Sequence, residues 1–253
     1  MKRVVGKALG LLRPRFDVRT LKLRNYLKLE VPPPSAVNWL VTRQVPWPMF
    51  DNDRYGCCTC AAAGHSVINW TDDSQRFIEP TTADILAAYA SVSGFELETG
   101  LNDNGAVALD VLKFWQREGI AGRKIGAFAS IDPKNLTLIK QAIWLFGGVY
   151  TGFALPQSAA DQELWDVGCL AYPKTWPWSW GGHAMMLGAY GSNGRFTAVT
   201  WGKLQAMTER FFRRYCVECY AVLSPDWLNP YSGLAVNGFD LNKLREDLKA
   251  VQR

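Results

Sequence analysis

A glycine-containing loop places a cysteine at the start of a predicted helix. The loop covers residues 51–57 and is followed by Cys58 and then by an alanine-rich run at residues 60–63. The positive end of a helix dipole favours a thiolate over a thiol, and the thiolate is the nucleophilic form. Far downstream, His183 enters an apolar run of strand-like composition. Because the chain has only two histidines, a Cys–His pair for nucleophilic chemistry has few possible members.

The composition is that of an ordinary globular protein with an uneven charge distribution. The 253 residues are 48% hydrophobic and 20% charged, enough for a sizeable core in one domain or two joined lobes. Residues 1–28 hold nine basic side chains and one acid, Asp17, so this segment has a net charge of +8. The whole chain has a net charge of +5, so residues 29–253 have a net charge of −3. This basic arm suits an acidic surface on a protein assembly or, more weakly, nucleic acid.

The sequence has no recognisable secretory signal or membrane span. The apolar run near the N-terminus is short and contains Lys7, and the most apolar stretch, residues 139–155, is too short to cross a bilayer comfortably. We therefore expect a soluble, cytoplasmic protein. In a reducing compartment its six cysteines are expected to be free thiols.

Helical patterns fill the first half of the chain and strand patterns the second. The predicted helices cover residues 58–70, 82–91 with Thr81 or Thr82 as cap, 107–118, 133–146, 208–215 and an amphipathic stretch beginning near Asp240. The predicted strands cover residues 149–155, 184–190, 196–201 and 220–223, and residues 35–50 are expected to be extended. Helices followed by strands favour an α+β fold with two lobes.

Several motifs occur in a defined order. They are Pro34-Ser35-Ala36-Val37-Asn38-Trp39, Asp51-Asn52-Asp53 with Gly56, Cys58 and Cys60, then Gly182-His183-Ala184, and Trp201-Gly202. This order resembles papain-like cysteine peptidases, the prokaryotic members in particular, over about residues 34–224. The resemblance implies a two-lobed α+β fold in which a helical lobe and a β-barrel-like lobe enclose the site.

The resemblance also implies the domain boundaries. We expect a basic arm at 1–33, a papain-like domain at 34–225 and a C-terminal extension with the amphipathic helix at 226–253. Within the domain, the helical lobe should cover about 51–146 and the β-rich lobe about 147–225.

The same resemblance assigns roles to individual residues and implies no cofactor. Cys58 is implied as the nucleophile, His183 as its base, and Asn52 as the side-chain donor to the oxyanion. Asn52 is one methylene shorter than the family's Gln, and Val199 stands where the family carries the Asn that orients the histidine. Thr200 is the polar alternative as orienter, although strand alternation points it to the opposite face.

Other residues have structural interpretations. Trp180 and Trp201 either wall the cleft or fill a core. His65 lies two helical turns from Cys58, too far to be its base, and is interpreted as a core histidine. The Cys57-x-x-Cys60 and Cys216-x-x-Cys219 pairs are separated by too much chain for a typical zinc site, so no metal is predicted.

Two hypotheses follow for the function. The first is a cysteine peptidase or amidase acting on a peptide or isopeptide bond of a protein substrate. The second is a catalytically impaired papain-like module that serves as a structural or binding component of an assembly, such as a phage particle, docked through its basic arm. Cys58 and His183 favour the first hypothesis, and Val199 favours the second.

Overall fold

The computed structural model describes residues 7–27, 32–40, 46–168, 172–228 and 234–236. The described helices are α1 (Cys58–Asp73), α2 (Thr82–Ser93), α3 (Ala108–Arg117), α4 (Leu136–Phe146) and α5 (Glu209–Tyr215). The described strands are β1 (Leu21–Lys22), β2 (Val37–Asn38), β3 (Ala127–Ile131), β4 (Val149–Leu155), β5 (Leu164–Trp165), β6 (Gly181–Tyr190), β7 (Arg195–Thr200), β8 (Lys203–Thr208) and β9 (Cys216–Leu223). The predicted α+β class is confirmed.

The helices begin and end at residues whose chemistry favours those positions. Thr81 caps α2 in a reciprocal capping box with Asp84, as the sequence predicts. Asn135 caps α4 through the backbone N–H of Leu138, and Gly147 ends that helix in the left-handed region at φ 72°. The predicted helices in this part of the chain are confirmed, with ends that differ by up to three residues.

Helix α1 is the central element of the helical side. Its residues 58–71 are all buried, so it is surrounded by protein and not amphipathic. Small side chains let its neighbours approach closely. At Gly64, an added Cβ would lie 2.7 Å from Ile85 and 2.9 Å from the ring of Phe50. Helix α1 therefore packs closely against α2 and against Phe50.

The strands form one mixed sheet. Its order is β1-β3-β9-β4-β6-β7-β8-β5, with β2 paired to β6. The long pairs are antiparallel, and β1–β3 and β5–β8 are parallel. The sequence did not predict β3, because Ala127–Ile131 has small residues, or β8, whose half-polar Lys203–Thr208 resembles a loop.

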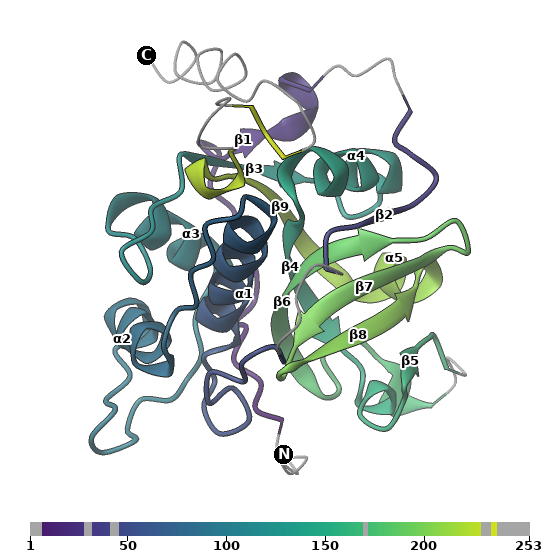
Figure 1. Ribbon diagram of the computed structural model, residues 1–253. Helices are drawn as coiled ribbons and strands as arrows, with labels where there is room; N and C mark the ends of the chain where they lie inside the picture. Colours follow the sequence, from purple (N-terminus) through teal and green to yellow (C-terminus); the bar gives the residue numbers. More distant parts are fainter. Residues whose placement is uncertain (1–6, 28–31, 41–45, 169–171, 229–233, 237–253) are drawn as a thin grey trace.

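The helices α1, α2 and α3 lie on one side of the molecule and the sheet from β4 to β8 lies on the other (Figure 1). The N-terminal segment, drawn in purple, passes between the two sides before β1 joins the sheet beside β3 (Figure 1). Part of the basic arm thus runs between the helical side and the sheet (Figure 1). The predicted helix near Asp240 lies outside the described residues. No helix of the described part is long and apolar enough to cross a membrane.

Candidate active site

Cys58 is the first residue of α1, as the sequence predicts. Its side chain is fully buried, and its Sγ accepts a hydrogen bond from the backbone N–H of Ala184 at 3.4 Å. Ala184 directly follows His183 on β6. This contact brings the N-terminus of α1 against the strand that carries the histidine, so the two predicted residues come from opposite sides of the cleft to one place.

His183 has a fixed ring orientation. Its Nε2 lies 2.5 Å from Oγ1 of Thr200, and its ring stacks on Trp201 with centroids 4.0 Å apart and planes 16° from parallel. The other ring nitrogen, Nδ1, is buried and has no hydrogen-bond partner within the described residues. The imidazole therefore has one nitrogen bound to a hydroxyl and one nitrogen free to handle a proton.

The position of Thr200 corrects the expectation from strand alternation. Val199 is fully buried and pairs with Met186, whereas Thr200 is the last residue of β7 and its hydroxyl reaches the histidine. The chain leaves strand geometry immediately afterwards, with Trp201 at φ 45° and Gly202 at φ 69°. Alternation of faces is an unsafe guide at a strand end of this kind. The hydroxyl of Thr200 is thus a hydrogen-bond partner of the His183 ring.

The tryptophans predicted beside the histidine lie against each other with tilted rings. Trp180 and Trp201 are both buried and lie with ring centroids 5.5 Å apart. Lys7 lies over both rings, with its Nζ 5.6 Å from each centroid. The indole N–H of Trp201 donates to the carbonyl of Ala8 at 3.2 Å. Trp201 therefore contacts both His183 and the N-terminal segment, and Trp180 contacts Trp201 and the N-terminal segment.

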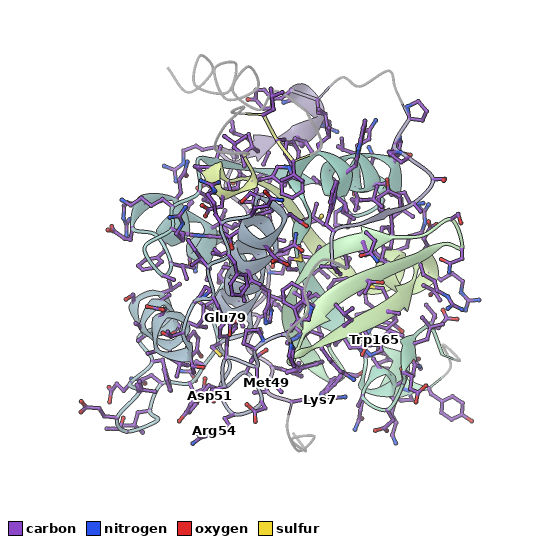
Figure 2. The ribbon with its side chains drawn as sticks, in the orientation of Figure 1. Lys7, Met49, Asp51, Arg54, Glu79 and Trp165 are labelled. Atoms are coloured by element: carbon purple, nitrogen blue, oxygen red, sulfur yellow. The ribbon has the colours of Figure 1, made fainter. Side chains whose placement is uncertain are left out.

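Asn52 lies at the edge of the cleft and is buried. Its side-chain Nδ2 donates to the carbonyl of Tyr55 at 3.2 Å, which leaves the second amide hydrogen for another acceptor. Its backbone carbonyl accepts from the N–H of Ala8 at 3.1 Å. Lys7 and the loop residues Met49, Asp51 and Arg54 lie along the same edge of the molecule (Figure 2).

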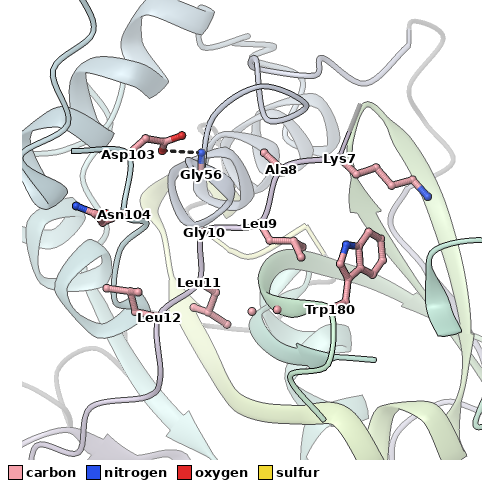
Figure 3. A pocket seen from close by; sticks show the side chains of 12 residues that line it. Lys7, Ala8, Leu9, Gly10, Leu11, Leu12, Gly56, Asp103, Asn104 and Trp180 are labelled. Carbon is pink, nitrogen blue, oxygen red and sulfur yellow. Dashed lines mark hydrogen bonds between the residues drawn. The ribbon is translucent and has the colours of Figure 1, made fainter. Parts of the chain in front are cut away.

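Residues 7–12, here called the strap, occupy the cleft between the lobes (Figure 3). The strap is bound to both sides by hydrogen bonds. On the helical side these are Ala8 N to Asn52 O at 3.1 Å, Ala106 N to Gly10 O at 2.8 Å and Leu12 N to Ala106 O at 3.0 Å. On the β-rich side they are Leu11 N to Gly182 O at 3.1 Å, Trp201 Nε1 to Ala8 O at 3.2 Å and Lys7 Nζ to Ala160 O at 2.7 Å.

Glycines allow this close approach. An added Cβ would lie 1.8 Å from Gly56 O if built on Gly10, 2.1 Å from Gly10 O if built on Gly105, and 2.0 Å from Leu11 O if built on Gly182. All of these contacts are with backbone atoms, which cannot rotate away. A cavity of about 310 Å³ remains along the strap, between Asp103 and Trp180. The strap thus fills the cleft directly over Cys58.

Burial controls the electrostatics of the pair. Desolvation raises the pKa of Cys58 to about 11, although the backbone N–H groups of Ala184 and Gly10 act in the opposite direction. Desolvation also lowers the pKa of His183 to about 3, with further contributions from His65 and Lys7. With the strap in place, the two side chains are a neutral thiol and a neutral imidazole at pH 7.

His65 and Cys57 have structural contacts. His65 is buried and its Nε2 lies 2.8 Å from the carbonyl of Pro48, in line with the core interpretation. Cys57 is buried and its Sγ donates to the carbonyl of Phe50 at 3.4 Å. Within the part of the chain that is described, no three His, Cys, Asp or Glu side chains gather as a metal site would require.

Two features of the site were not predicted from the sequence. One is the strap, whose only sequence signal is a glycine in a basic segment. The other is Glu218, a buried carboxylate of β9 in the same region of the sheet. Acidic residues near position 218 look like ordinary surface charge in the sequence, because burial of a strand residue depends on partners far away in the chain.

No protein-family model matches the chain, and no curated protein is similar to it in sequence. Solved structures are similar in fold. Xylellain, a cysteine protease from Xylella fastidiosa, has a TM-score of 0.65 at 15% identity, over 88% of this chain and 98% of that one. Digestive procathepsin L 3 of Tenebrio molitor has a TM-score of 0.56 at 13% identity, over 87% and 76%. Procathepsin B S9 from Trypanosoma congolense has a TM-score of 0.55 at 9% identity, over 88% of each chain.

These neighbours are cysteine proteases or their pro-forms, and the similarity covers most of the length of this chain. The chain therefore has the papain-like fold of the cysteine proteases.

Proposed function

We propose that this protein is a cysteine peptidase or amidase that cleaves a peptide or isopeptide bond of a protein substrate. One observation carries the proposal. The Sγ of Cys58, at a helix N-terminus, contacts the residue next to His183, whose ring has Nε2 on Thr200 and Nδ1 without a partner. This supports the assignment of Cys58 as nucleophile, His183 as base and Thr200 as orienter, the three roles that covalent catalysis of this kind uses.

The arrangement suits an acyl-transfer mechanism. Nδ1 of His183 takes the proton of the Cys58 thiol, and the sulfur attacks the carbonyl carbon to form a tetrahedral intermediate. The backbone N–H of Cys58 and the free amide hydrogen of Asn52 stabilise the oxyanion. The intermediate expels the amine, which receives the proton from His183, and leaves a thioester. Water, deprotonated by His183, attacks the thioester, and the acid and the free thiol are released.

Turnover requires displacement or removal of the strap. Cys58 is fully buried, and the backbone of Gly10 lies against its sulfur. Opening the cleft would hydrate the pair, which lowers the pKa of Cys58, raises that of His183 and favours the thiolate–imidazolium state.

The test uses a variant that cannot seat the strap. In Gly10→Ala the new Cβ meets the carbonyl of Gly56, so the strap must leave. We expect this variant to cleave a mixture of protein-derived peptides, with products found by mass spectrometry, and Gly10→Ala/Cys58→Ala to cleave none. Leu12→Ala, a change at an exposed strap residue, is the control that stays closed. Cleavage that persists without Cys58, or no cleavage by an opened and folded Gly10→Ala protein, contradicts the proposal.

A non-catalytic role in an assembly is the second candidate. The observation that favours it is the complete burial of Cys58 and His183, which keeps both groups neutral. In this case the basic arm would dock the protein on an assembly such as a phage particle, or on nucleic acid. Part of the arm is already engaged within the chain, because Asp17 binds Lys113 and Arg15 binds Asp110. This candidate predicts no Cys58-dependent cleavage when the strap is displaced.

A further inference from the structure

Asp103 connects two segments of the helical side of the cleft. Its Oδ1 accepts a hydrogen bond from the backbone N–H of Gly56 at 2.9 Å (Figure 3). The same oxygen accepts a hydrogen bond from the hydroxyl of Tyr89 at 2.7 Å, and that hydroxyl accepts one from the backbone N–H of Gly105 at 2.8 Å. One carboxylate oxygen and one hydroxyl therefore join the loop before Cys58 to the backbone at Gly105.

The surrounding fold fixes both members of this pair. Tyr89 on α2 is fully buried, with its ring 5.1 Å from that of Phe95. Burial and the hydrogen bond to Asp103 raise the pKa of Tyr89, so its hydroxyl keeps the proton that it donates to the carboxylate. Asn102 and Gly105 on either side of Asp103 have left-handed φ values of 61° and 81°. Hydrogen bonds to a carboxylate are strong, and linked hydrogen bonds reinforce one another.

The Asp103–Tyr89 pair lies directly behind the slot that holds the strap. A Cβ built on Gly56 would lie 3.0 Å from Oδ1 of Asp103, 3.2 Å from the Tyr89 hydroxyl and 3.3 Å from Cα of Gly10. Gly56 is therefore enclosed between the pair and the strap. Gly105 closes the slot from the other segment, because a Cβ there would lie 2.1 Å from the carbonyl oxygen of Gly10. The width of the slot thus depends on how the pair holds these two glycines.

We propose that Asp103 is a positioning residue, which holds the loop of the nucleophile through Gly56 and sets the width of the strap slot together with Tyr89. This inference rests on the proposed peptidase function. Gly56 is two residues before Cys58, so a shift of Gly56 displaces the backbone N–H of Cys58 that meets the oxyanion. Asp103 acts through the backbone and transfers no proton in the reaction.

The first test is a double-mutant cycle in the full chain that needs no substrate. Gly10→Ala and Asp103→Ala are made alone and together, and the rate of iodoacetamide labelling of Cys58 at pH 8 reports how often the strap opens. The Cβ of Gly10→Ala meets the carbonyl of Gly56, so a released Gly56 can move away from it. We expect the factor by which Gly10→Ala speeds labelling to fall about fivefold or more in the Asp103→Ala background.

Two controls separate the width of the slot from a general loosening of the fold. Lys7→Ala removes an anchor of the strap on the β-rich side, and its effect on labelling should be equal in both backgrounds. Asn104→Ala, a change at an exposed residue of the same cavity, should leave the Gly10→Ala factor unchanged. If Asp103→Ala does not fold, Tyr89→Phe takes its place in the cycle and should reduce the factor in the same direction. Equal Gly10→Ala factors in the two backgrounds, or an equal fall for Lys7→Ala, overturn the proposal.

The second test measures peptide hydrolysis in Gly10→Trp, whose side chain is too large for a widened slot and displaces the strap in every variant. Adding Asp103→Ala should lower kcat about tenfold or more, with a smaller change in KM. Asp103→Asn keeps an oxygen that can accept both hydrogen bonds and should retain most of kcat. A kcat for Asp103→Ala within about a factor of two of the Gly10→Trp parent, or an equal loss in Asp103→Asn, overturns the positioning role. If the labelling cycle shows coupling but no variant cleaves a peptide, control of the slot by Asp103 stands and the proposed peptidase function fails, so the two failures are distinguishable.

Discussion

The hydrogen bond between Thr200 and His183 gives the sharpest prediction for catalysis. Thr200→Val replaces the hydroxyl by a methyl group of similar shape and leaves Nε2 of His183 buried without a partner. A hydrogen bond to a charged group contributes about 1.5–3 kcal/mol, and His183 is charged after it takes the proton from Cys58. At about 1.4 kcal/mol per factor of ten, kcat should fall roughly tenfold to a hundredfold.

The assay is peptide hydrolysis by the opened Gly10→Ala protein with and without Thr200→Val. KM should change little, because Thr200 contacts the base and does not line the cleft. Thr200→Ser keeps the hydroxyl and should retain most of the parent kcat. If Thr200 served only to fill space, Thr200→Val, which keeps the shape of the side chain, should retain more activity than Thr200→Ser. Thr197→Val on the same strand is the matched control. A kcat for Thr200→Val within a factor of two of the parent would refute the assignment of Thr200 as orienter.

Three further outcomes are expected. Asn52→Ala should lower kcat about a hundredfold with a smaller change in KM, and steady-state kinetics in which KM alone changes would contradict an oxyanion role. Gly10→Ala should speed iodoacetamide labelling of Cys58 at least about tenfold over the parent, measured by mass spectrometry; an unchanged rate would mean that the strap does not control access. Glu218→Gln should change how the free energy of unfolding depends on pH, measured by urea titration. Burial raises the pKa of Glu218 from 4.5 to about 7, so its contribution to stability falls as pH rises through that window. Burial lowers the pKa of His183 from 6.5 to about 3, so its contribution rises with pH between those values. The two contributions oppose each other between pH 4.5 and 6.5. In that range the free energy of unfolding of Glu218→Gln should rise, relative to that of the parent, by about 1.4 kcal/mol per pH unit. Parallel pH curves for the two proteins would contradict the burial of an ionisable Glu218.

The sequence predicts the parts of the fold that depend on local pattern. The start of α1 at Cys58 follows from a glycine loop before an alanine run, and the end of α4 at Gly147 follows from a glycine that tolerates the left-handed region. The strand that carries His183 follows from its apolar composition. Each of these signals lies within a few neighbouring residues, so it can be recognised in the sequence without knowledge of the tertiary structure.

Features that depend on distant partners are absent from the sequence patterns. The basic arm resembles a solvated tail, yet the strap within it is bound through backbone groups of both lobes, which residue types do not encode. Thr200 reaches His183 because the chain turns at Trp201 with φ 45°. Glu218 is buried on β9, where its strand pairs with β4 at Gly152. Each of these requires the tertiary arrangement.

The proposed mechanism requires that His183 activates Cys58 once the strap is displaced. Its most direct test is the pH dependence of Cys58 alkylation in Gly10→Ala, resolved from the other thiols by mass spectrometry, with and without His183→Ala. We expect half-maximal reactivity in Gly10→Ala well below pH 8.5, the range of an ordinary thiol, and a return to that range in Gly10→Ala/His183→Ala. Identical titration curves for the two proteins would contradict it.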